Sequence, residues 1–274
     1  EIFLKSLKKN YSSPIILISS YQLLNLQMKK LNYKKKIKLL EFNNLSKYVL
    51  NNKTINLIDI NYAFSKPFEK ISSKYNSYIE ESFDIAFKII NDGITNKLIN
   101  GPISKKNFLK KKYLGITEYI ADKYSVNKNA MLIYNKHLSV CPVTTHLPLK
   151  LVTKEITKKR IKEKVNIINE FYKNFLKFKP RIAVVGLNPH CESTLNFNED
   201  QKILLPTIKS LKKRININGP FPADTLFLKK NRKKYDVIVG MYHDQVLTPI
   251  KTLFNFEAIN ITVGLPFIRI SPDH

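Results

Sequence analysis

The stretch DVIVGMYHDQ, residues 236–245, decides the fold. It contains a short apolar run, and the polar residues His243, Asp244 and Gln245 follow soon after that run. Residues 237–240 are typical of a buried strand, and the histidine follows where such a strand leaves the core. Two more stretches repeat this order: LSVCPVTTH ends at His146, and RIAVVGLNPH ends at His190. Together with His243, three of the five histidines therefore stand just past a predicted buried strand.

Outward from these stretches, predicted strands alternate with predicted helices. Further strands are expected at 14–20, 55–60, 97–103, 130–134 and within 258–270, and helices at 77–92, 156–178 and 198–213. This alternation is typical of an α/β protein with a largely parallel sheet. No repeat and no low-complexity linker interrupts the chain. We therefore expect residues 1–274 to form a single unit with two interleaved α/β subdomains.

Length and composition favour a globular cytoplasmic protein. The 274 residues are 43% hydrophobic, which is ample for a sizeable core. Cys141 and Cys191 provide no disulfide framework, as expected in a reducing compartment. The longest apolar run, PIILI, is far too short to cross a membrane, and EIFLKSLKKN lacks the apolar region of a signal peptide. The chain begins without Met and stops directly after an apolar stretch, so we expect a fragment.

The net charge of +26 raises the question of a polyanionic partner. Only five of the 47 basic residues are Arg, the better reader of phosphates and base edges. The lysines are scattered among Asn and Ile, so we interpret them as compositional drift and runs such as YKKKIK as solvated faces. Nucleic acid is not the expected partner, although a polyanion-binding surface stays an alternative.

The three strand-end histidines are candidates for a metal site. In open α/β sheets the ligand crevice lies outside the carboxyl ends of the strands, so distant segments can meet there. Three neutral imidazoles with an open position suit a catalytic divalent ion. A single histidine in such a place is more often a surface or core residue, and the spacing here matches no local metal motif. His137, at a strand start, has no comparable context.

Seven segments then carry a family resemblance. In order they are GPISKK, GITEYIAD, TTHLPLK, RIAVVGLNPH, GPFPADTLF, MYHDQVLTPIK and INITVGLPFIRISPDH. Together they resemble the 4-hydroxythreonine-4-phosphate dehydrogenases of vitamin B6 biosynthesis, from about Gly101 onward and more weakly before it. The resemblance implies a fold similar to the isocitrate and isopropylmalate dehydrogenases rather than the Rossmann fold. The absence of any Gly-x-Gly agrees with that expectation.

The resemblance also implies a reaction. Members of this family oxidise the C3 hydroxyl of 4-phosphooxy-threonine with NAD, or NADP. The product loses carbon dioxide to give 3-amino-2-oxopropyl phosphate. A divalent ion, such as zinc, magnesium or cobalt, lowers the pKa of the hydroxyl that is oxidised. The expected small-molecule partner is therefore a phosphorylated amino acid.

By the same resemblance, His146, His190 and His243 are metal ligands shared between the two subunits of a homodimer. Asp224 and Asp244 match acids that support catalysis, and a carboxylate beside a ligating imidazole fixes its tautomer. The sequence leaves a simpler role open for Asp224, which follows Pro222 and could be a turn or cap residue.

The substrate-binding residues implied by the resemblance are Thr117, Lys251, Asn260, Arg269 and Lys105. Arg269 is a conspicuous member because Arg is so rare in this chain, although it could instead form a structural ion pair. Lys105 could touch substrate or only cap a turn. No residue is assigned to the cofactor.

Three departures from the family pattern leave alternatives open. Ile116 stands where the family usually has His, so one substrate contact is expected to be lost. Cys191 and the bulky residues of ESTLNF follow His190, and the thiol could bind metal or simply pack. Val246 replaces a common Gly, with strain expected if that position needs a positive φ. A degenerate, non-catalytic relic and a basic binding protein on the same fold are therefore alternatives to an enzyme.

Overall fold

A computed structural model of the chain describes residues 2–7, 9, 11–109, 112–113, 115–192 and 197–272. The chain forms two compact units, Glu1–Lys112 (unit 1) and Tyr113–His274 (unit 2). The boundary falls at one place along the chain, and the interleaving of subdomains that the sequence predicts stays a prediction.

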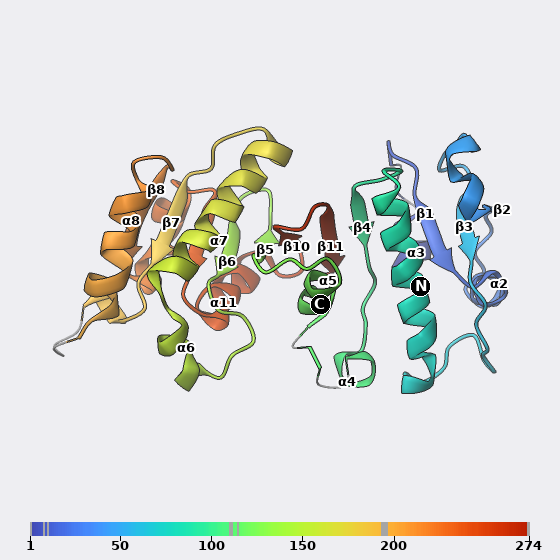
Figure 1. The fold of residues 1–274 in the computed structure, drawn as a ribbon, viewed down its shortest axis with the longest axis horizontal. Helices are drawn as coiled ribbons and strands as arrows, with labels where there is room; N and C mark the ends of the chain where they lie inside the picture. Colours follow the sequence, from blue (N-terminus) through green and yellow to red (C-terminus); the bar gives the residue numbers. More distant parts are fainter. Residues whose placement is uncertain are drawn as a thin grey trace. The chain divides into compact units, whose positions relative to one another are not determined.

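Unit 1 is a small three-layer α/β unit, drawn blue to green in Figure 1. Its elements are α1 (Ile2–Ser6), β1 (Ile16–Ser19), α2 (Tyr21–Lys30), β2 (Ile37–Leu39), β3 (Ile55–Asp59), α3 (Asn76–Asn91), β4 (Lys97–Ile99) and α4 (Lys105–Phe108). The parallel sheet has the order β1-β3-β2. Leu57 packs with α1 and α2 on one face, whereas Ile58 packs with α3 on the other. This alternation follows from the two-residue period of a strand.

Unit 2 carries the larger sheet. Its elements are α5 (Ile116–Lys123), β5 (Ala130–Tyr134), β6 (Ser139–Pro142), α6 (Leu149–Glu155), α7 (Lys158–Phe171), β7 (Ile182–Val185), α8 (Leu205–Leu211), β8 (Ile217–Phe221), α9 (Ala223–Leu226), α10 (Lys229–Arg232), β9 (Val237–Gly240), α11 (His243–Phe254), β10 (Ile259–Val263) and β11 (Ile268–Pro272). The strand order in this unit is β11-β10-β5-β6-β9-β7-β8. Neighbours from β6 to β8 are parallel, and those from β11 to β6 are antiparallel.

Helices cover both faces of this sheet. Helices α7 and α8 pack on one face, where Val165 and Ile208 meet Val184 and Val239 of the central strands. Helix α11 packs on the opposite face through residues that include Ile250 (Figure 1). The α/β class predicted from the sequence is thus confirmed, and the strands nearest the candidate site are parallel. Because β6, β9, β7 and β8 are parallel neighbours, their carboxyl ends lie along one edge of the sheet, which we call the rim.

Two of the predicted helices are α-helical over only part of their expected length, and a short π-helix forms the rest. Helix α7 begins at the cap Thr157, whose hydroxyl accepts a hydrogen bond from Arg160 N at 3.2 Å. It passes into a π-turn, Tyr172–Leu176, which ends at the left-handed Lys177. The helix predicted over 198–213 instead begins with a π-helix, Asp200–Leu204, which continues into α8. Among the described residues, no helix is long and apolar enough to cross a membrane.

Candidate functional site

Three adjacent parallel strands deliver the three candidate histidines. Strands β6, β9 and β7 lie side by side, and Cys141, Val239 and Val184 stand level across them. Their carboxyl ends therefore share one rim, and His146, His243 and His190 follow these ends along the chain. The ring centroids of His146 and His243 lie 5.9 Å apart, while His190 lies on the next loop.

His243 is held by its own neighbour and by helix α11. It stands just past the end of β9, as predicted from the sequence, and it is the first residue of α11, a helix that the sequence did not predict. Its Nδ1 lies 2.7 Å from Asp244 Oδ1. In the tautomer with the proton on Nδ1, this nitrogen donates a hydrogen bond to the carboxylate. Nε2 then keeps a free lone pair, as a metal ligand requires.

Gln245 connects the β9–α11 turn to the end of β7. Its Oε1 accepts a hydrogen bond from Met241 N at 2.7 Å, and its Nε2 donates to Gly186 O at 2.7 Å. The segment that carries His243 and the segment that leads to His190 are thereby hydrogen-bonded to each other. Sequence reasoning did not single out Gln245, although its place two residues after a candidate ligand was visible.

The loop after β7 presents His190 at the surface. His190 is exposed, and it has the left-handed φ of 56° within the turn Pro189–Cys191. Cys191 is buried and packs against Gly186. Burial, with a smaller effect from Asp200, raises the pKa of the Cys191 thiol to about 11. A protonated, buried thiol favours packing over metal binding. Residues 193–196 of ESTLNF lie outside the described part of the chain.

Asp224 lies on a short helix of its own, α9. It is exposed in the first turn of α9, and its Oδ1 accepts a hydrogen bond from Thr225 N at 2.8 Å. Burial is the main cause of the raised pKa of the Cys191 thiol, and the charge of Asp224 makes a small contribution to it. The local hydrogen bond also fits the turn role that the sequence left open.

A buried polar group lies at the other end of the rim. Arg269 of β11 is only 3% exposed and donates from Nη1 to Thr262 Oγ1 at 3.0 Å and to Thr117 Oγ1 at 3.3 Å. Thr262 stands directly opposite Arg269 across the β10–β11 ladder. These contacts place the guanidinium among hydroxyl groups, and the structural ion pair considered from the sequence stays an alternative. Burial lowers its pKa to about 10, an effect that Glu118 partly offsets.

Gly115 joins the two groups. A methyl group on its Cα would lie 2.8 Å from Glu118 Oε2 and 3.6 Å from His146 Cε1. Gly115 caps α5, whose first turn contains Thr117 and Glu118, so Arg269, the threonines and His146 form one continuous neighbourhood. Glu118 Oε2 is buried and has no hydrogen-bond partner among the described residues. Buried carboxylate oxygens ordinarily have partners, so a ligand donor fits this position.

The remaining predicted substrate residues are less closely connected. Asn260 shares a face of β10 with Thr262, and its Oδ1 is buried without a hydrogen-bond partner among the described residues. Lys251 is half-buried on α11, two turns beyond His243. Lys105 is exposed at the first residue of α4 in unit 1. These placements neither assign nor remove a substrate role for the two lysines.

Two departures from the family pattern have a structural meaning. Val246 is fully buried within α11 and packs with the apolar face beneath that helix, so the strain expected from a positive φ does not arise. Its side chain lies where a Cβ on Gly240 would be. Ile116 is 8% exposed at the first residue of α5, immediately before Thr117. A larger polar side chain there would stand beside the Arg269 group.

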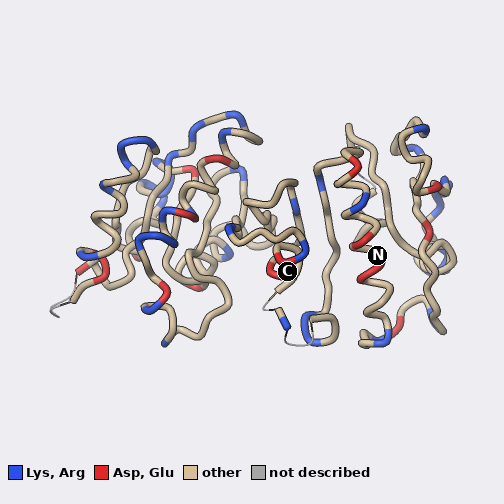
Figure 2. The backbone as a smooth tube through the Cα atoms, viewed as in Figure 1, with Lys and Arg blue, Asp and Glu red and all other residues tan. Residues whose placement is uncertain are grey.

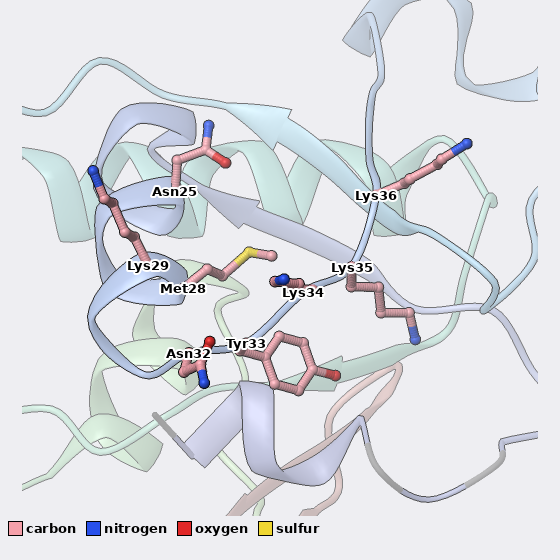
Figure 3. Close-up of a pocket in the computed structure, with 8 residues that line it drawn as sticks. All are labelled: Asn25, Met28, Lys29, Asn32, Tyr33, Lys34, Lys35 and Lys36. Atoms are coloured by element: carbon pink, nitrogen blue, oxygen red, sulfur yellow. The ribbon is translucent and has the colours of Figure 1, made fainter.

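Unit 1 contains a basic pocket of about 670 Å³, and none of the predicted site residues lines it. It is lined by Asn25, Met28, Lys29, Asn32, Tyr33, Lys34, Lys35 and Lys36. Figure 3 shows the side chains of Lys29, Lys35 and Lys36 pointing in different directions. Figure 2 shows Lys and Arg spread over many elements of both units rather than gathered in one stripe. Both observations agree with the interpretation of solvated lysine faces.

Solved structures place this fold among dehydrogenases. A 4-hydroxythreonine-4-phosphate dehydrogenase from Klebsiella pneumoniae matches with a TM-score of 0.85 and 28% identity, over 100% of this chain and 86% of that one. A terephthalate 1,2-cis-dihydrodiol dehydrogenase from Burkholderia xenovorans LB400 matches with a TM-score of 0.65 at 16% identity, over 98% and 82% of the two chains. The second likeness concerns the fold alone.

The family follows from the sequence match. Residues 10–274 match the family described as "Pyridoxal phosphate biosynthetic protein PdxA", and the chain belongs to this family of oxidoreductases. A 4-hydroxythreonine-4-phosphate dehydrogenase from Sulfurihydrogenibium sp. is 42% identical over 226 residues, 80% of this chain and 68% of that protein. A D-threonate 4-phosphate dehydrogenase from Salmonella typhimurium is 40% identical over 164 residues, 59% of this chain and 50% of that protein. The chain thus spans between half and about two thirds of these relatives.

Proposed function

We propose that the chain oxidises 4-phosphooxy-threonine with NAD or NADP and releases carbon dioxide, as a step of pyridoxal phosphate biosynthesis. One observation carries the proposal. The buried Arg269–Thr262–Thr117 group continues through Gly115 to His146 and its neighbour His243. A phosphate-binding group and an imidazole pair on one rim fit a small substrate that bears a phosphate and a hydroxyl to be oxidised.

The phosphate end would be bound by Arg269. A guanidinium presents several donors to an anion, and here Nη1 already contacts two hydroxyls that could turn their own donors toward a phosphate oxygen. Burial strengthens such an interaction because water does not screen it. Asn260 and Lys251 would supply further contacts, and Lys105 is kept as a substrate residue on the family resemblance alone. The free acceptors Asn260 Oδ1 and Glu118 Oε2 suit donors of the amino-acid moiety.

The imidazole end fits a divalent ion. Two imidazoles that bind one zinc through nitrogens at ~2.0–2.1 Å have centroids within roughly 6.5 Å of each other, and His146 and His243 lie 5.9 Å apart. Among the described residues of one chain, no three His, Cys, Asp or Glu side chains are grouped to hold a metal. We therefore assign the third position to His190 of a second subunit, so that a homodimer completes the site.

Each residue near the imidazoles then has a chemical task. Asp244 holds the proton on His243 Nδ1 and leaves Nε2 free, while Asp224 would supply negative charge near His190. When bound, zinc, magnesium or cobalt would lower the pKa of the substrate hydroxyl and withdraw electron density from the oxidised carbon. When bound, NAD or NADP would accept the hydride, and no residue of this chain is assigned to it. A cytoplasmic location and the homodimer stay predictions.

A turnover assay tests the proposal. The full-length protein would be given NAD or NADP, a divalent ion, and either 4-phosphooxy-threonine or D-threonate 4-phosphate, and NAD(P)H formation followed. We expect turnover of the amino-acid substrate that chelation abolishes and added metal restores. Preference for the threonate would transfer the chain to the second activity named among its relatives.

The same assay separates the alternatives. A folded dimer without turnover of either substrate would favour the non-catalytic relic. A basic binding protein would instead show polyanion binding that weakens steeply with salt, as counterion release predicts. Turnover together with shallow salt dependence would remove both alternatives.

A further inference from the structure

Asp200 is a fully buried carboxylate in the loop system of β7. It is 0% exposed, at the start of the π-turn before α8. Its Oδ1 accepts a hydrogen bond from Leu187 N at 2.7 Å, and its Oδ2 accepts from Asn188 N at 3.0 Å and Asn188 Nδ2 at 2.9 Å. A buried carboxyl group that accepts three hydrogen bonds is satisfied in place, and its removal takes the acceptor from those donors.

Two of the donors are backbone N–H groups, and all three belong to the two residues that precede Pro189 and His190. Leu187 and Asn188 lie three and two residues ahead of the histidine. After the intervening Pro189, His190 and Cys191 are both left-handed, with φ of 56° and 60°. The left-handed conformation costs free energy for any residue other than glycine, and it persists only where surrounding contacts stabilise it. Something in the fold must therefore hold this loop.

Packing around Gly186 shows which contacts hold it. A methyl group on Gly186 would lie 2.5 Å from Cys191 Sγ and 2.9 Å from Asp200 Oδ1. The thiol and the carboxylate thus both pack closely against Gly186. Cys191 N also donates to Asn188 O at 3.0 Å, which closes the turn around His190.

We propose that Asp200 is a positioning residue for metal binding, acting through His190. Its carboxylate fixes the Leu187 and Asn188 peptides, and these set the direction in which the exposed imidazole leaves the loop. The inference rests on the proposed function, because it takes His190 to be a ligand. Without the carboxylate the histidine keeps its chemistry but samples several directions, so metal affinity falls.

A purely structural role for Asp200 is the competing explanation, and Asp236 provides a matched control. Asp236 also accepts three hydrogen bonds, from Arg181 N, Nε and Nη2, at 2.8, 3.1 and 2.8 Å. It precedes β9, at the opposite end of that strand from His243. Loss of either carboxylate removes hydrogen bonds to a charged group. Of the two, only Asp200 accepts hydrogen bonds from the segment that carries a candidate ligand, His190.

The test measures zinc affinity of the full chain by competition with a chromophoric chelator, and the visible spectrum with cobalt. We expect Asp200→Asn to weaken zinc binding roughly tenfold or more and to alter the cobalt bands, as loss of outer support does. Asp236→Asn should bind zinc within about threefold of the parent while its unfolding temperature falls. Asn188→Ala removes the side-chain hydrogen bonds to Asp200 and Glu199 and keeps the backbone contacts. It should weaken zinc binding by an intermediate factor and decides the matter if Asp200→Asn does not fold.

The outcomes separate the two levels of the argument. If His190→Ala binds zinc as the parent does, His190 is not a ligand, and both the proposed metal site and this inference fail. If His190→Ala loses affinity while Asp200→Asn and Asn188→Ala match Asp236→Asn, only the positioning role of Asp200 is overturned.

Discussion

Asp244 Oδ1 lies 2.7 Å from His243 Nδ1, within one turn at the start of α11. The carboxylate is largely exposed, at 80%, whereas the imidazole is 35% exposed. A carboxylate that is exposed to solvent can orient a neighbouring imidazole by a hydrogen bond without being buried itself. The pair therefore constrains the histidine at little desolvation cost.

Replacement of Asp244 by Asn tests this constraint. The amide can donate to Nδ1 and so stabilise the wrong tautomer, in which Nε2 carries the proton. We expect zinc affinity to fall roughly tenfold, at the low end for such partners because the carboxylate is exposed. Calorimetric titration of the full chain would measure it. An affinity equal to that of the parent would mean that Asp244 does not set the tautomer.

Arg269 should matter for substrate and little for stability. Its guanidinium is buried, and replacing a buried charge by an apolar side chain is often neutral or stabilising. We expect Arg269→Met to raise KM at least tenfold, since a hydrogen bond to a charged group is worth about 1.5–3 kcal/mol. Its free energy of unfolding should stay within about 1 kcal/mol of the parent. Arg232→Met, at a half-buried arginine on α10, is the matched control and should leave KM unchanged.

The pH dependence of this comparison has a definite sign. Burial lowers the pKa of Arg269 from 12.5 to about 10, so the folded protein releases the proton more readily than the unfolded chain. The charge therefore costs folding stability at neutral pH, and this cost is relieved as the pH rises through about 10. We expect any stability advantage of Arg269→Met, measured by chemical denaturation, to shrink above that pH. An advantage that grows there would contradict a lowered pKa.

The Arg181–Asp236 pair makes an independent prediction about stability. Burial alone would raise the pKa of Asp236, but the hydrogen bonds from Arg181 outweigh it, and the pKa lies below its usual value of 3.8. A lowered pKa contributes stability that is present above the unfolded value and lost as the pH falls through the folded value. Because Arg181 is half-exposed, we expect Asp236→Asn to cost only about 1 kcal/mol at neutral pH. Thermal unfolding at neutral and strongly acidic pH should show the difference disappear in acid.

Apolar periodicity predicted the central strands and α3 because their burial is a local property of the residues. Strands β7 and β9 are four consecutive buried residues each, and α3 has its apolar residues on one face. Strand β2 was missed because lysines surround it, and its position at a sheet edge tolerates them. Helix α11 was missed because Pro249 lies within it and it starts so soon after β9.

The position of the candidate histidines on the fold was predictable where strand ends determine it. The three histidines follow adjacent parallel strands, as their common sequence context predicted. Thr262, Gln245 and Asp200 were not foreseen, because their partners lie at distant positions in the sequence or depend on register. Thr262 meets Arg269 only because β10 and β11 pair antiparallel with that register. No periodicity in the sequence fixes such a pairing.

Ile116 allows the sharpest test of the phosphate end. It is the first residue of α5, it is 8% exposed, and it precedes Thr117, which Arg269 contacts. A histidine there would add a donor next to the buried guanidinium. We expect Ile116→His to lower KM for the phosphorylated substrate by roughly ten- to a hundredfold, the worth of one hydrogen bond to a charged acceptor. The value of kcat should stay within a few-fold, because Arg269 still holds the phosphate.

Two comparisons decide how the Ile116 result is read. Ile116→Val keeps the site apolar and should leave KM unchanged, which separates the added donor from a change in packing. The buried imidazole should also lower the unfolding temperature, since a polar group replaces an apolar one in a nearly closed position. A lower KM together with a lower unfolding temperature is therefore the expected signature. An unchanged KM despite that loss of stability would show that the first turn of α5 does not approach the substrate.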